Sequence, residues 1–74
     1  MRLSLFLRSD DNLQVVLHGH TIGGLAARLK QVINACREEN LSRPRWGKLI
    51  VAEGNFKDRE PLPDELLDLV SEAR

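Results

Sequence analysis

The sequence is poor in the features that mark several large classes of protein. It has one cysteine, no tyrosine and three aromatic residues among 74, and its 11 basic side chains balance its 11 acidic ones. A single cysteine cannot form an intrachain disulfide, and no apolar run approaches the length of a membrane span. Balanced charge is also unusual for a dedicated nucleic-acid binder, which normally has a clear basic excess. These absences favour a small intracellular domain.

The N-terminus and the lone thiol both favour a cytoplasmic location. The apolar stretch that begins at Leu3 is broken by Ser4 and ends at Arg8, which is too short for the core of a secretory signal. Cys36 lies on the apolar stripe of a predicted helix, where a lone cysteine usually behaves as a small buried hydrophobe. The length allows one domain, residues 1–74, with a single small core.

Two alternating segments near the N-terminus predict a β-hairpin. Residues 3–8 and 13–18 place apolar side chains at every second position, which is the period of a strand with one buried face. Residues 9–12, between them, have the sequence Ser-Asp-Asp-Asn, which is rich in the residue types that favour turns. The side chains expected to face the long helix are Leu3, Leu5, Leu7, Leu13, Val15, Leu17, Leu49 and Val51.

The clearest pattern is a long amphipathic helix that follows residue 21. Its apolar residues are Ile22, Leu25, Ala26, Leu29, Val32, Ile33 and Cys36. At 100° per residue they fall within an arc of about 120°, and Leu29 lies in the middle of that arc. Thr21 suits the N-cap because its hydroxyl can accept a free backbone N–H, and Asn40 suits the C-terminal stop.

A third strand and a short second helix complete the pattern. The β-branched residues of 48–52 predict a strand, and Pro63 suits the first turn of a helix. The order β-β-α-β-α predicts an α+β domain, with a three-stranded mixed sheet packed against the long helix. A right-handed crossover makes the second and third strands parallel. We expect the first strand between them, in the order 2-1-3, with 1-2-3 as the alternative, and both helices on one face.

No set of residues predicts catalysis, a cofactor or a metal site. His18, His20 and Cys36 have suitable side chains for zinc, but a structural zinc site usually takes four ligands, often in closely spaced pairs. Cys36 also lies near the C-terminal end of its helix, where the helix dipole disfavours a reactive thiolate. Gly23 and Gly24 follow a strand but lack the lysine of a P-loop and the spacing of a dinucleotide site. We therefore expect no enzyme, no cofactor and no metal.

Residues 43–48 have the composition of a contact segment. The segment consists of Arg43, Pro44, Arg45, Trp46, Gly47 and Lys48. We expect a loop that the proline stiffens, with its cations suited to phosphates and its aromatic ring suited to an unpaired base. Arginine and tryptophan are also the commonest hot spots of protein interfaces. A third interpretation is that Trp46 folds inward and covers the core.

Two further surfaces are candidates for contact with a partner. The outer face of the long helix has few charges, and its small or uncharged side chains would allow a close approach. Its residues are Ala27, Gln31 and Asn34. The face of the sheet opposite to the helix carries an apolar cluster of the kind that usually marks an interaction site. Its residues are Phe6, Val16 and Ile50.

Charge is divided unevenly along the chain. Residues 1–50 carry eight basic and four acidic side chains, and residues 51–74 carry three basic and seven acidic ones. A dipolar surface suits a protein partner or a second copy of the chain, because its acidic part would repel phosphate. The sequence therefore predicts a small non-enzymatic protein-binding regulator, adaptor or inhibitor, of the kind that phages and plasmids direct against host machinery. The alternative is a nucleic-acid-binding module that uses residues 43–48. We expect no membrane partner.

Overall fold

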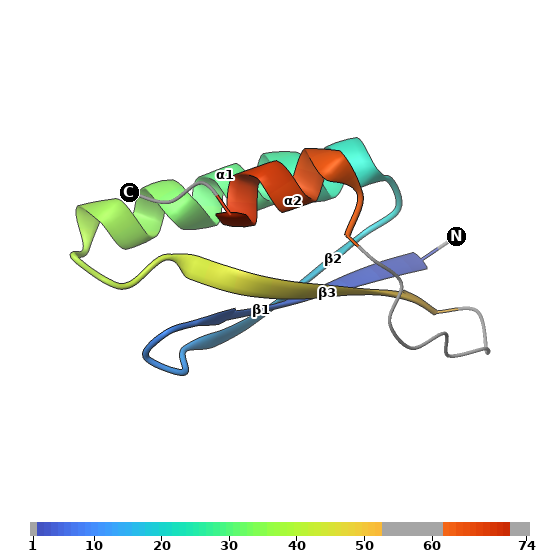
Figure 1. Ribbon diagram of the computed structural model, residues 1–74. Coiled ribbons are helices and arrows are strands. Elements are labelled where there is room, and N and C mark those ends of the chain that lie inside the picture. Colours follow the sequence, from blue (N-terminus) through green and yellow to red (C-terminus); the bar gives the residue numbers. More distant parts are fainter. Residues whose placement is uncertain (1, 53–61, 72–74) are drawn as a thin grey trace.

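The predicted α+β fold is confirmed by the computed structural model, which describes residues 2–52 and 62–71 (Figure 1). The elements are β1 (Arg2–Ser9), β2 (Gln14–Gly19), α1 (Ile22–Glu38), β3 (Pro44–Ala52) and α2 (Asp64–Ser71). Their order is the predicted β-β-α-β-α. Most of the acidic residues that give the C-terminal part its negative charge lie in 53–61 and 72–74, outside the described residues.

The three strands form one sheet in the order β2-β1-β3, as predicted, and the alternative order 1-2-3 is wrong. β1 is antiparallel to both neighbours, so both strand pairs are antiparallel, where the sequence predicts a mixed sheet. The two outer strands run parallel to each other on either side of β1. Leu5, at the middle of β1, is opposite Leu17 of β2 and Leu49 of β3. Paired residues point to the same face of a sheet, so this register puts the alternating leucines of all three strands on one side.

The β1–β2 hairpin closes through a short turn that Ser9 and Asn12 hold together. The backbone N–H of Asn12 donates to the carbonyl of Ser9, and the N–H of Ser9 donates to the carbonyl of Leu13, each over 3.0 Å. Asn12 has a positive φ of 68°, which asparagine tolerates better than most residues. The Ser9 hydroxyl accepts the N–H groups of Asp11 and Leu13. These residue types explain why the turn forms here.

Both ends of α1 have the caps that the sequence predicts. The Thr21 hydroxyl accepts the N–H of Gly24 over 2.9 Å at the N-terminus. At the C-terminus, Asn40 has a φ of 58°, and the N–H of Leu41 donates to the carbonyl of Cys36 over 2.8 Å. Helices commonly end in this way, with one residue in the left-handed conformation and the next N–H bonded to a carbonyl of the last helical turn.

Both helices cover the same face of the sheet, where they lie side by side (Figure 1), and the core lies between the two layers. The core residues are Leu3, Leu5, Leu7, Leu25, Ala26, Leu29, Ile33, Leu49, Leu66 and Val70. Leu29 has no exposed surface, as its central place in the apolar arc predicts. Neither of these two helices, which are those of the described residues, covers the opposite face of the sheet.

The structure corrects the prediction that residues 43–48 form a loop. β3 begins at Pro44, four residues earlier than predicted, and pairs with β1 from Arg2 opposite Ala52 to Ser9 opposite Pro44. A proline is tolerated at the first residue of an edge strand, where its missing N–H costs no ladder bond. The register shifts between Arg8 and Ser9, which leaves Arg45 as an extra residue in a bulge.

Two side chains are less buried than predicted. Leu13 is exposed because β2 begins only at Gln14, so Leu13 belongs to the turn and not to the alternating strand. Cys36 is half-buried, because it lies in the last turns of α1, beyond the four residues that α1 buries completely. Val51 lies in β3, and its side chain is outside the described part of the chain.

Candidate binding surface

The open face of the sheet brings together residues from all three strands. The open face is defined here by Arg2, Ser4, Phe6 and Arg8 of β1, Gln14, Val16 and His18 of β2, and Trp46, Lys48 and Ile50 of β3. These residues alternate with the buried leucines, so they point away from the helices. Phe6, Val16 and Ile50 form the apolar cluster that the sequence predicts on this face, and Trp46 and Lys48 join it from β3.

Two aromatic rings of the open face are accessible. Phe6 is 39% exposed and Trp46 is 46% exposed, so the interpretation that Trp46 folds inward over the core is wrong. Because Arg8 is opposite Trp46, Phe6 and Trp46 lie diagonally across neighbouring strands, roughly 7–8 Å apart. Both line a groove of about 300 Å³ that also includes Val16, Lys48 and their neighbours.

Arg8 and Trp46 form a cross-strand pair at the hairpin end of this groove. The guanidinium carbon of Arg8 lies 4.7 Å from the centre of the Trp46 ring. A cation over an aromatic face is stabilised by about 0.5–1 kcal/mol at an exposed site, and stacking leaves the edge of the guanidinium available as a donor. The pair therefore holds a positive charge over one face of the Trp46 ring, which remains 46% exposed.

Positive charge on the strands is not balanced by negative charge. The three strands contain Arg2, Arg8, Arg45 and Lys48 but no aspartate or glutamate. Within residues 2–52 and 62–71, the carboxylates lie in the hairpin turn, at the end of α1 and on α2. The zero net charge of the whole chain therefore hides a strongly basic strand layer. Counting charges by strand, instead of by half of the chain, would have revealed this layer from the sequence.

The predicted segment 43–48 divides into parts with different surroundings. Arg43 is half-buried, and its guanidinium donates a hydrogen bond to the carbonyl of Leu69 in α2. The Arg43 Nε is buried and has no hydrogen-bond partner among the described residues. Arg43 is therefore held against α2, whereas the sequence predicts that the cations of this segment contact a partner. Arg45 is exposed at the bulge, whereas Trp46 and Lys48 belong to the open face.

The hairpin end of the groove continues into a hollow of about 400 Å³. Its lining includes Arg45, Trp46 and the turn residue Asp10. The neighbouring carboxylate of Asp11 accepts a hydrogen bond of 2.6 Å from the hydroxyl of Ser42, which ties the turn to the segment before β3. This end of the groove therefore has mixed charge.

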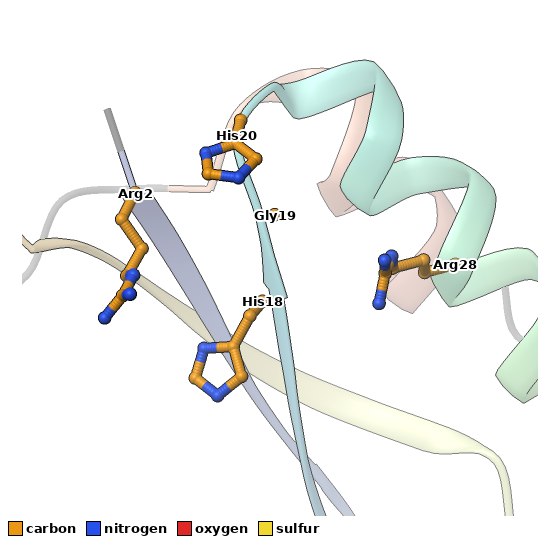
Figure 2. Close-up of a pocket in the computed structure, with 5 residues that line it drawn as sticks. All are labelled: Arg2, His18, Gly19, His20 and Arg28. Carbon is orange, nitrogen blue, oxygen red and sulfur yellow. The ribbon is translucent and has the colours of Figure 1, made fainter.

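The opposite end of the open face leads to a cleft of about 440 Å³ at the β2 edge. The cleft, shown in Figure 2, is lined by Arg2, His18, Gly19, His20 and Arg28. Figure 2 shows Arg2 on β1, His18 on β2 and the Arg28 side chain extending from α1 towards β2. The His18 Nδ1 lies 3.1 Å from the hydroxyl of Ser4, which fixes the ring against β1. Among residues 2–52 and 62–71, none that lines this end has a carboxylate.

The other predicted contact residues lie elsewhere. Ala27, Gln31 and Asn34 are exposed on α1, in the helix layer, so the fold does not bring them together with the open face. His18 and His20 lie in the cleft at the β2 edge, whereas Cys36 is near the other end of α1. In the described residues, no three histidine, cysteine or acidic side chains are grouped so that they could hold a metal ion.

Comparison of the chain with protein-family models, curated proteins and solved structures found no match. Neither α1 nor α2, the two helices of the described residues, is long and apolar enough to cross a membrane. The chemistry of the open face is therefore the main guide to function.

Proposed function

We propose that this protein is a small, non-enzymatic module that binds single-stranded nucleic acid on the open face of its sheet. One observation carries the proposal: the strands present two exposed aromatic rings and several cations without a carboxylate. Unpaired bases stack on aromatic side chains, and their phosphates are attracted by cations. Phe6 and Trp46 in the groove supply the aromatic rings, and Arg8 and Lys48, which also line it, supply the cations.

The zero net charge of the chain does not oppose this proposal. Electrostatic attraction depends on the charge that faces the ligand, and the Debye length is only about 8 Å at physiological salt. Acidic side chains of α2 face away from the open face, because the sheet lies between them. The local basic field of the strands therefore counts more than the total.

A protein partner is the second candidate, and the apolar part of the open face favours it. A regulator, adaptor or inhibitor, or a second copy of the chain, could bury Phe6, Val16 and Ile50. Such a partner would also cover Arg8 and Lys48, and a buried charge without an opposite charge is strongly destabilising. The bases of a nucleic acid can cover the apolar side chains while its phosphates pair with the cations, so we favour nucleic acid. The proposal includes a cytoplasmic location, which the lone cysteine supports.

Trp46, the only tryptophan, is a natural reporter of binding. We propose to titrate the protein with an oligothymidylate of about twelve nucleotides, within the usual site sizes of single-strand binders, and to follow the fluorescence of Trp46. Stacking should quench it. Replacing Phe6 by alanine should cost about 1–3 kcal/mol, or roughly 5- to 150-fold in affinity, because one base loses its aromatic contact.

Leu67→Ala is the matched control. Leu67 is 44% exposed, much like Phe6, but lies on α2 in the helix layer. This variant should bind like the wild type, and circular dichroism should show that both variants fold. Absence of quenching at low salt, or equal affinity of the two variants, would refute the proposal. Light scattering that shows a wild-type dimer broken by Phe6→Ala would refute it in favour of self-association.

A further inference from the structure

The cleft at the β2 edge lies at the end of the open face and has the composition of a phosphate site. Two arginines and two histidines line it, and none of its lining residues in the described part of the chain is acidic. Neither Arg2 nor Arg28 makes an ion pair with a carboxylate of the described residues. Their charges are therefore not neutralised by neighbours in this part of the chain.

The two ends of the open face differ in charge, which favours one end for contact with phosphates. At the hairpin end, Asp10 lines the hollow beside Arg45 and Trp46. At the other end, Arg2 and His18 lead into a cleft that has no carboxylate among its described lining residues. Phosphates are attracted more strongly at the second end, because the first end has a carboxylate beside its cations. The distance between the ends is roughly 20 Å, six residues along β1 from Arg8 to Arg2.

His18 is held in a position that suits the donation of a hydrogen bond to a phosphate. Its Nδ1 is 3.1 Å from the Ser4 hydroxyl, and Ser4 itself is buried. When the hydroxyl donates to Nδ1, the ring proton is on Nε2, so His18 presents an N–H group away from β1. Figure 2 shows that ring beside Arg2 on β1, with Arg28 reaching towards β2 from α1. Cleft side chains thus come from two strands and a helix.

We infer that this cleft receives the sugar–phosphate backbone of the strand whose bases lie on the open face. The inference rests on the proposed function and adds a path to it: the strand extends from the Arg8–Trp46 pair, across the sheet, to Arg2 and Arg28. The cleft side chains are spread along the β2 edge, which fits an extended chain of phosphates better than one compact anion.

The test is the salt dependence of binding of the twelve-nucleotide oligothymidylate. Arg2→Gln with Arg28→Gln should lower the slope of log affinity against log salt by about 1.4, at roughly 0.7 for each phosphate contact of a single strand. If the plots of log affinity against log salt for the wild type and the variant meet near 1 M salt, the variant should bind roughly 25-fold more weakly at about 0.1 M. All four substituted positions in this test and its control are exposed, so the fold should persist.

Lys30→Gln with Arg37→Gln is the matched control, since it removes the same charge from other positions of α1. Its slope should stay close to that of the wild type. If the cleft variant has the same slope as this control while Trp46 is still quenched, the inference is overturned and the proposed function stands. If the wild type itself does not bind the oligonucleotide, both are overturned.

Discussion

Leu29 offers the most direct test of the packing that holds the open face in place. It has no exposed surface and belongs to the core between α1, α2 and the sheet. Leu29→Ala should destabilise the protein by about 2–5 kcal/mol, because apolar contacts are lost and a cavity remains. Stability of about 0.05–0.15 kcal/mol per residue gives roughly 4–11 kcal/mol for a chain of this length. One substitution therefore removes a large part of it.

The expected change is large enough to measure by thermal unfolding. An unfolding entropy of about 2.1 cal/mol/K per residue gives roughly 6 °C for each kcal/mol at this length, so Tm should fall by about 12–30 °C. Leu67→Ala is again the control, since it removes the same atoms from an exposed position and should shift Tm by less than about 6 °C. Equal shifts in the two variants would refute the assigned packing.

Two further predictions concern α1. Thr21→Ala should cost about 1 kcal/mol in unfolding free energy, because the N–H of Gly24 loses the hydroxyl that caps it, and Thr21→Ser should recover most of that loss; equal stability of the alanine and serine variants would contradict the cap. A thiol reagent should label half-buried Cys36 in the folded protein without global unfolding. The labelled protein should bind the oligonucleotide like the unlabelled one, because the open face is on the other side of the sheet from α1. Labelling that is only as fast as global unfolding would contradict this.

The structure changes how substitutions in 43–48 should be interpreted. The sequence presents Arg43 and Arg45 as two cations of one contact segment. In the structure, Arg43 is bonded to Leu69 and anchors α2, whereas Arg45 is exposed at the bulge. A joint substitution would therefore mix a change in stability with a change in binding. Arg45 alone is the residue with which to test this part of the surface.

Local pattern was sufficient for the elements of this protein. The hairpin and α1 were predicted because their signals involve residues close together in the chain: alternation over residues 3–8 and 13–18, a threonine cap, and asparagines that accept positive φ. The strand order followed as well, because a hairpin fixes one neighbour of β1 and the crossover fixes the direction of β3. These features depend on local sequence and chain connectivity.

Only the tertiary structure decided which side chains share a surface. The start of β3 at Pro44 depends on β1, whose backbone groups need partners along its whole length, and no signal within 44–48 carries that information. Pairing with β1 in turn places Trp46 beside Arg8, on the same face as Phe6, and gathers the cations of two separate strands away from the acidic side chains of α2. The helices, the hairpin and the strand order follow from the sequence, whereas the open face exists only because distant strands are paired in one register.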